Sequence, residues 1–195
     1  LPYNLHPDRK GGLVPDIDLK IKARDGRTAF VLYCIDSHSY NWTDRYYEWI
    51  TEEQIRDYES RSAAYTAANG GKPVPSLAFF HIPLPEYGIA TSDQKAPLVG
   101  TRREVCCCPD HNSGMFAAMK RCGDVKAVFV GHDHDDDYSV MWDGILLSYD
   151  RYTGGDTVYN HLENGARVIL LHEDGSQDTW VTLKGGRVLN EWRME

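Results

Sequence analysis

Hydrophobic and polar residues follow different patterns along the chain. From Asp16 to Ala23 they alternate ("DIDLKIKA"), which is typical of a β-strand with one solvent-exposed face. Continuous apolar runs then occupy residues 28–36, 77–81 and 127–131. Such runs predict strands that are covered on both faces. Residues 1–15 are rich in proline, glycine and charge, and indicate a loop.

Helical patterns lie between the apolar runs. The stretch "TEEQ" at 51–54 predicts a capping box, in which Thr51 caps the helix and Gln54 reaches back to the cap. Four residues that follow share one helical face: Ile55, Tyr58, Ser62 and Tyr65. The helix is expected to end at 69–71, which reads Asn-Gly-Gly. A shorter second helix is expected after a cap at Asn112 or Ser113.

The last part of the chain indicates antiparallel hairpins instead. Asp143-Gly144 and Asp174-Gly175 each stand between two strand-like runs, which is a hairpin signal. The sequence therefore predicts alternating strands and helices over 28–134 and antiparallel hairpins over 138–190. We expect a layered α/β fold with a mixed sheet, and residues 1–195 form part of a single domain.

Composition and charge limit the classes of function. The 195 residues carry a formal net charge of −8 at neutral pH, which argues against a broad contact with nucleic acid or with anionic membrane. A phosphate substrate remains compatible with this charge, because metal ions can supply a local positive field. No apolar stretch approaches the roughly 20 residues of a membrane helix. The compartment is not indicated, and an extracytoplasmic location would need a preceding signal peptide.

Residues that bind metals follow all three buried strands. Asp36 ends the first and His38 comes just after it, His81 ends the second, and His132 and His134 follow the third. In open α/β sheets, ligands bind outside the carboxyl ends of the strands. Imidazole suits borderline metals such as Zn, Fe or Mn, so the pattern predicts a metal site at this edge.

The motif Gly131-His132-Asp133-His134 is the strongest part of this pattern. We expect Gly131 to let the backbone turn sharply. We expect Asp133 to orient a metal-binding imidazole without binding the metal itself. A solvated acidic loop with incidental histidines is the alternative interpretation. Alternating aspartates also suggest a surface calcium site, although Tyr138 and Gly144 occupy positions where an EF-hand needs glycine and glutamate.

These residues carry a resemblance to a known family. "VFVGHDHDDDY" resembles the closing motif of calcineurin-like metallophosphoesterases, and "LAFFHIPLPEY" resembles the single-histidine motif that precedes it. "VLYCIDSHSYN", "HNSGMF" and "GARVILL" are similar to the purple-acid-phosphatase-like branch. The resemblance implies an α-β-β-α sandwich with a two-metal site of Fe, Mn or Zn. It implies that His81 and His132 bind one metal, that His134 binds the other, and that a metal-held hydroxide attacks the phosphoester in line.

The chain departs from the family pattern in two ways. Asp136 replaces the usual asparagine two residues after the histidine motif, where it would change the surroundings of the ligands. The motifs G-D-x-x-D and G-N-H, which the family places before the single histidine, are absent. The chain thus resembles the C-terminal half of the domain, and the catalytic histidine is expected on a preceding segment. His38 is a candidate substrate contact. The open flank of the sheet predicts a dimer, or association with an N-terminal fragment.

Two other functions remain open from the sequence. One is a non-catalytic module that binds metal or a partner, because three histidines without a bridging carboxylate predict weak metal binding and little activity. The other uses the aromatic residues Tyr46, Tyr47 and Trp49 as a partner-binding surface, although packing of a helix start explains them as well. The five cysteines, three of them adjacent at 106–108, indicate reduced thiols rather than a disulfide framework, with a soft-metal site as the alternative.

Overall fold

The computed structural model describes residues 16–41, 46–93, 96–154 and 161–194. The expected loop at 1–15 lies outside these residues. A seven-stranded mixed sheet in the described part has the order β1-β2-β5-β7-β9-β8-β6. Its four central strands, β2, β5, β7 and β9, run parallel, and β1, β8 and β6 run antiparallel to their neighbours. The bounds are β1 Ile17–Lys22, β2 Thr28–Cys34, β5 Ser76–Phe79, β6 Leu98–Val99, β7 Val125–Val130, β8 Ser139–Trp142 and β9 Ile145–Tyr149.

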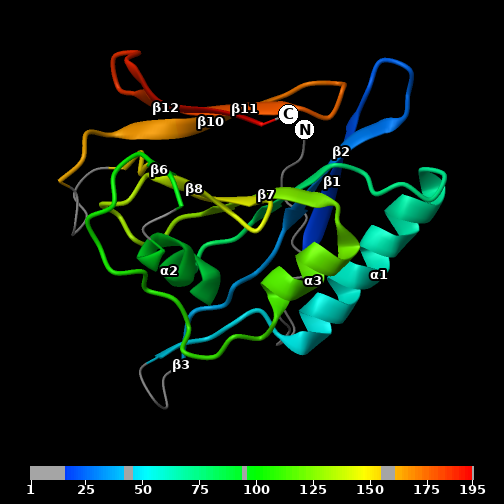
Figure 1. Ribbon diagram of the computed structural model, residues 1–195, viewed down its shortest axis with the longest axis horizontal. Helices are drawn as coiled ribbons and strands as arrows, with labels where there is room; N and C mark the ends of the chain where they lie inside the picture. The colour runs from blue at the N-terminus through cyan, green and yellow to red at the C-terminus, as the bar shows by residue number, and fades with distance from the viewer. Residues whose placement is uncertain (1–15, 42–45, 94–95, 155–160, 195) are drawn as a thin grey trace.

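A second sheet covers one face of the first. Its antiparallel strands are β10 Gly165–Leu171, β11 Gln177–Leu183 and β12 Val188–Met194. Figure 1 shows this sheet on one side of the seven-stranded sheet and the helices on the other. The interface is apolar: Leu77, Phe129 and Leu146 from the central strands pack with Ile169 and Trp192. Burial of this apolar area holds the two sheets together.

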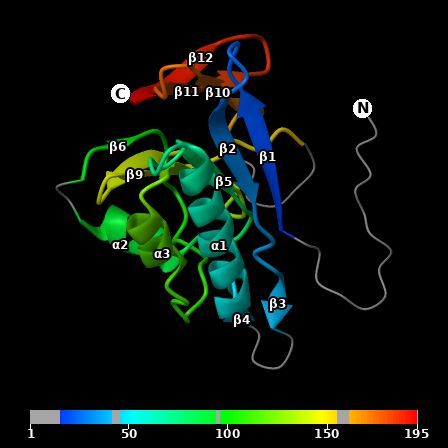
Figure 2. The ribbon, with the colours of Figure 1, turned by 90° about the vertical axis from the view of Figure 1, so that its right-hand side faces the viewer.

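Three helices of the described part of the chain cover the opposite face: α1 Glu52–Ala68, α2 Pro85–Ser92 and α3 Met115–Cys122. Figure 2 shows them along that face of the sheet. The capping box of Thr51 and Gln54 is confirmed. A buried carboxylate joins α1 to the sheet, because Asp124 accepts hydrogen bonds from the hydroxyls of Tyr33, Tyr58 and Ser62. The mixed α/β fold predicted from the sequence is therefore confirmed in its layers.

Two helix predictions needed correction. Helix α3 is capped by Gly114, which has φ of 89° and no side-chain cap, instead of by Asn112 or Ser113. The Asn112 side chain accepts a hydrogen bond from the amide of Gly114, the residue just before the first helical residue. The hydrophobic pattern does not predict helix α2, because prolines follow the apolar run at 77–81 and prolines usually mark the end of a strand. Pro85 instead occupies the first turn of a helix, where its missing N–H costs nothing.

Strand β1 forms one edge of the large sheet. Asp18 of this strand faces α1, where it accepts hydrogen bonds from Arg61 and Tyr65. Ile17, Leu19 and Ile21 point to the other face, and 37–47% of their surface is exposed. The expected dimer or fragment contact across this flank stays a prediction. Within the described residues, no helix is long and apolar enough to cross a bilayer.

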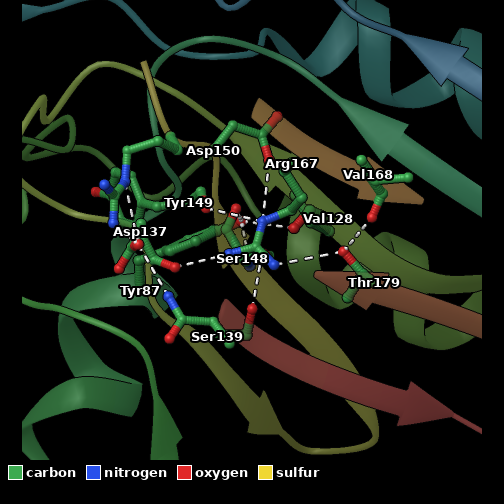
Figure 3. Close-up of polar contacts among 12 residues, drawn as sticks. Tyr87, Val128, Asp137, Ser139, Ser148, Tyr149, Asp150, Arg167, Val168 and Thr179 are labelled. Atoms are coloured by element: carbon green, nitrogen blue, oxygen red, sulfur yellow. Dashed lines mark hydrogen bonds and ion pairs between the residues drawn. The ribbon is translucent and has the colours of Figure 1, made fainter. Parts of the chain in front are cut away.

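A buried arginine fastens the second sheet to the first (Figure 3). The Arg167 side chain, 1% exposed, extends from β10 and pairs with Asp150 at 3.4 Å. Its guanidinium also donates to the carbonyls of Tyr149 and Asp137 at 3.1 and 2.7 Å. Asp137 precedes β8 and Tyr149 ends β9. The arginine therefore joins the β8–β9 hairpin to the covering sheet.

A histidine-lined pocket as the candidate functional site

A pocket of about 350 Å³ opens at the carboxyl ends of the central strands. It is lined by four of the predicted residues, His38, His81, His132 and His134, and by Asp133. Strands β5 and β7 are parallel neighbours, so the segments that follow them emerge side by side. The sheet topology thereby brings together residues that the sequence placed after separate strands.

His81 and His132 face each other across this pocket. His132 Nδ1 lies 3.2 Å from His81 Nε2, and the two rings meet edge to face. Zn–N bonds of about 2.0–2.1 Å in tetrahedral geometry would set two nitrogen ligands of one ion about 3.3 Å apart. The two imidazoles therefore have the spacing of two ligands of a single ion.

Backbone geometry places His132, and glycine has a different role from the one predicted. His132 itself adopts a left-handed conformation with φ of 79°, whereas Gly131 does not. A Cβ on Gly131 would lie 3.2 Å from His81 Nδ1, so the glycine leaves room for the facing imidazole. His38 also has a positive φ, of 62°. Left-handed conformations in non-glycine residues cost energy and concentrate at functional sites.

The local environment keeps the facing histidines neutral. Burial lowers the pKa of His81, and His134 lowers it further, while Asp133 opposes the shift. Burial also lowers the pKa of His132 against the opposing effect of Asp133. Neutral imidazole is the form that binds metals, so both side chains are prepared for ligation at neutral pH.

The acidic run after the histidines is buried, so it is not a solvated loop. Asp133, Asp135, Asp136 and Asp137 are each at most 3% exposed. Their carboxylates turn to different protein donors, such as the Tyr149 hydroxyl for Asp133 and Arg151 for Asp137. They do not converge on one point as calcium ligands would. This run is part of the structural support of the pocket.

Asp133 and Asp136 both hold segment 103–107, which contributes Glu104 and Cys107 to the pocket lining. Asp133 Oδ2 accepts the Cys107 amide at 3.0 Å, and Asp136 Oδ1 accepts the amides of Arg103 and Glu104. The second oxygen of Asp136 has no hydrogen-bond partner, and burial raises the pKa of this carboxyl to about 6. We expected Asp133 to orient a metal-binding imidazole and Asp136 to change the surroundings of the ligands, and both roles stay predictions.

His38 lies on the pocket wall with one ring nitrogen already engaged. Its Nε2 is 2.8 Å from Gln54 Oε1. The Gln54 amide nitrogen donates to the carboxylate of Asp16 and to the Asp36 carbonyl, so its oxygen must accept. His38 Nε2 is therefore the donor, and Nδ1 is left as the acceptor of the neutral ring. Gln54, the capping-box partner of Thr51, thus also sets the tautomer of a pocket histidine.

Other residues of the pocket were not predicted to lie in it. Tyr40, Tyr47, Glu104 and Cys107 also line it. Tyr47 packs edge to face on the His132 ring with centroids 4.6 Å apart, so packing of a helix start does not account for this residue. Tyr47 belongs to the short hairpin β3 Tyr40–Asn41 and β4 Tyr46–Tyr47, for which the sequence has no clear strand pattern.

These residues fit a metal ion only in part. The described residues contain no group of three or more His, Cys, Asp or Glu side chains arranged to hold an ion. The described residues therefore present a pair of nitrogen ligands, with His134 lining the same pocket. This pair is short of the four positions that zinc fills. No catalytic step through a metal follows from the residues described.

Comparison with known proteins identifies relatives of this chain. No family model matches the chain. It is 35% identical over 153 residues to probable inactive purple acid phosphatase 29 of Arabidopsis thaliana, and 34% identical over 173 residues to phosphatase DCR2 of Saccharomyces cerevisiae. The relatives are purple-acid-phosphatase-like proteins, which is consistent with the resemblance to calcineurin-like metallophosphoesterases. The matches cover 72% and 79% of this chain.

A solved structure gives the same relationship at the level of fold. A dimetal phosphatase from Danio rerio superimposes with a TM-score of 0.57 over 90% of this chain, at 12% identity. The chain covers 59% of that structure and 28–41% of the curated relatives it matches. The fold is therefore shared. The activity of the relatives belongs to proteins that are longer than the region matched by this chain.

Proposed function

We propose that this chain supplies the histidine-bearing part of a metal-dependent phosphoester-hydrolysing site. The observation that carries the proposal is the 3.2 Å approach of His132 Nδ1 to His81 Nε2 at the carboxyl edge of a parallel sheet. The names of a yeast phosphatase relative and of a dimetal phosphatase with this fold support phosphoester hydrolysis as the reaction class.

The side chains of the pocket have distinct proposed roles. His81 and His132 hold one ion together, and His134, on the same wall, binds a second. Two bound metal ions would polarise a phosphoester and activate a water molecule for attack. Tyr47 fixes the His132 ring by edge-to-face packing. His38 offers a hydrogen-bond acceptor to the substrate side of the pocket, since its other nitrogen is held by Gln54.

The remaining ligands and the catalytic histidine are proposed to lie outside the described residues. The acidic side chains nearest to the histidines are already committed to protein donors, as with Asp133 and the Tyr149 hydroxyl. They supply no carboxylate that bridges two ions. The relatives are two to three times longer than the matched region, which leaves room for further ligands in the whole protein.

A non-catalytic module that binds metal or a partner is the second candidate. Three Arabidopsis relatives are named probable inactive purple acid phosphatases. The described residues also lack a three-ligand group, which fits a protein that keeps the fold without the two-metal chemistry. In this case the histidine pair would bind one ion weakly.

Hydrolysis of p-nitrophenyl phosphate by the full natural protein, together with its metal content, separates the two candidates. For the enzyme, we expect about two metal ions per protein and a loss of activity of at least about a hundredfold in His132→Ala. His172→Gln is the matched control, since His172 bonds Asp178 in the second sheet, away from the pocket. A metal-loaded protein without hydrolysis would favour the non-catalytic module.

A further inference from the structure

His38 has a fixed place in the pocket that contains the histidine pair. It lines this pocket together with His81 and His132. Its backbone is left-handed, with φ of 62°, and its amide donates to Asp36 Oδ1 at 2.8 Å. The hydroxyl of the neighbouring Ser37 accepts a hydrogen bond from the His81 amide at 3.2 Å. The loop that carries His38 is therefore attached to the segment that carries a proposed metal ligand.

The side-chain amide of Gln54 is oriented by groups that can act in only one way. The Thr51 backbone N–H donates to Gln54 Oε1 at 2.8 Å. Gln54 Nε2 donates to the Asp16 carboxylate at 3.1 Å and to the Asp36 carbonyl at 2.8 Å. A backbone N–H can only donate, and a backbone carbonyl can only accept. Gln54 therefore cannot reverse its amide without losing these hydrogen bonds.

This orientation decides which nitrogen of His38 carries the proton. His38 Nε2 lies 2.8 Å from Gln54 Oε1, which accepts, so Nε2 is the protonated nitrogen of the neutral ring. Nδ1 is then a hydrogen-bond acceptor. It has no hydrogen-bond partner among the described residues, and it is not one of their buried polar atoms that lack a partner. A ligand in the pocket can therefore reach Nδ1.

The charge of the pocket lining gives this acceptor a consequence. Among the described residues, no lysine or arginine lines the pocket, whereas Glu104 and Asp133 do. The lone pair of Nδ1 repels an oxyanion that carries no proton, and it accepts a hydrogen bond from an oxyanion that does. Near neutral pH, inorganic phosphate retains at least one proton and sulfate retains none. The two anions therefore differ in the group that they present to His38.

We propose that Gln54 is a positioning residue of the pocket, which holds His38 as an acceptor so that a protonated phosphate group binds in preference to an unprotonated oxyanion. Gln54 does not line the pocket and acts through His38. This inference rests on the proposed function, because it takes a phosphate group as the ligand. It adds the residue that decides which form of the ligand is bound.

The tautomer of His38 is the first test. We label the full natural protein with nitrogen-15 at histidine, assign His38 through its backbone connections, and record the ring-nitrogen shifts by NMR at neutral pH. In the wild type, Nε2 should carry the proton and Nδ1 should not. Gln54→Met should populate both tautomers, because methionine offers no oxygen to Nε2. A proton on Nδ1 in the wild type would overturn the proposal.

The preference between anions is the second test. We measure the affinities of inorganic phosphate and sulfate for the zinc-loaded full protein by calorimetry. The ratio of the two affinities is compared between variants, so that the preference of the metal itself cancels. His38→Gln should lower this ratio about tenfold, because its amide can still bond Gln54 but has no group at the place of Nδ1. Gln54→Met should lower it about threefold, because only part of the rings then accept.

His38→Asn should restore most of the ratio. Asparagine places an amide oxygen near the position of Nδ1, and it tolerates the left-handed backbone of this residue. A ratio as low as that of His38→Gln would show that an acceptor at this point does not select the anion.

Thr51→Ala is the matched control for Gln54→Met. It removes the hydroxyl that accepts the Gln54 amide in the capping box, and it leaves the Thr51 N–H on Gln54 Oε1. It should therefore weaken the start of α1 without changing the tautomer of His38 or the ratio of affinities. Equal changes in the two variants would show that Gln54 acts only through the helix, and would overturn the proposal.

The results also separate this inference from the proposed function. Phosphate that binds with the same ratio in the wild type, His38→Gln and Gln54→Met would overturn the inference and leave the proposed function standing. A zinc-loaded protein that binds no phosphate would overturn both. The wild-type tautomer decides the first step even if a variant fails to fold, because its measurement needs no substitution.

Discussion

His132 Nδ1 lies 3.2 Å from His81 Nε2, although 51 positions separate these residues in the sequence. The approach follows from the sheet, because His81 follows β5 and His132 follows β7, and these strands are parallel neighbours. Both rings are in the neutral form that binds metals, since burial lowers the pKa of each. The pair is therefore positioned by the fold before any ion arrives.

Gly131→Ala tests whether the spacing of this pair matters. The added Cβ would lie 3.2 Å from His81 Nδ1 and must push the ring away, while the backbone of Gly131 suits alanine. We expect zinc affinity, measured by calorimetry, to fall about tenfold. The free energy of unfolding should change by no more than about 1 kcal/mol.

Gly154→Ala is the matched control for this change. No atom lies within 4 Å of a Cβ at Gly154, so the zinc affinity of the Gly154→Ala variant should equal that of the wild type. If zinc binds equally to both glycine variants, the histidine pair is not a metal site.

The hydrophobic pattern was sufficient to predict the central strands and the long helix, because each rests on a local signal. The capping box at Thr51 and Gln54 and the turn at Asp143-Gly144 are examples, and the structure contains both. The single-histidine and G-H-x-H motifs also led to His81 and His132, since strand ends in a parallel sheet meet at one edge.

The rest of the site depends on contacts that no local pattern records. Tyr47 reaches the His132 ring from a two-residue strand. A solvated acidic loop was one interpretation of the acidic run, yet Asp133 and Asp136 are buried because distant amides and a tyrosine hydroxyl satisfy them. A single sequence does not reveal such partners, which lie up to 33 positions away.

Asp136→Asn should remove a pH-dependent cost to stability. Burial raises the pKa of Asp136 from 3.8 to about 6, so the folded protein holds this proton more tightly than the unfolded chain. The contribution of Asp136 to the free energy of unfolding is therefore greatest at low pH. It falls as the pH rises from about 4 to about 6, and it does not recover at higher pH. Two pKa units correspond to about 3 kcal/mol as an upper value.

Urea denaturation at several pH values checks this expectation. At pH 7.5 the asparagine variant should be more stable than the wild type, by up to about 3 kcal/mol, because a neutral side chain avoids the burial of charge. At pH 4 the two proteins should differ little, since Asp136 is then protonated in the folded state. Equal stability curves across this range would show that Asp136 is charged at little cost.

Tyr58→Phe tests the buried carboxylate that joins α1 to the sheet. The Tyr58 hydroxyl donates to Asp124 Oδ1 at 2.5 Å, and both residues are at most 2% exposed. Loss of a hydrogen bond to a charged acceptor should lower the free energy of unfolding by about 1.5–3 kcal/mol in urea denaturation. Tyr46→Phe is the control, because Tyr46 is 57% exposed, and it should change stability by less than about 0.5 kcal/mol.

Arg167→Met tests the attachment of the second sheet. Methionine retains much of the apolar stem but leaves the Tyr149 and Asp137 carbonyls and the Asp150 carboxylate without this donor. The Asp150 side chain is 40% exposed, so most of the cost should come from the two carbonyls that lose their donor, and the free energy of unfolding should fall by about 2–4 kcal/mol. Arg187→Met is the control, because the Arg187 side chain is 65% exposed, and it should be nearly neutral.

A double-mutant cycle shows how much of this cost comes from the unpaired acid. Asp150→Asn alone should be mild, because burial raises the pKa of Asp150 to about 6 and the neutral amide is cheaper to bury. In the double variant with Arg167→Met, the total loss should be smaller than the sum of the single losses, since no uncompensated carboxylate remains. Strictly additive losses would mean that Arg167 stabilises the sheets through the two carbonyls alone.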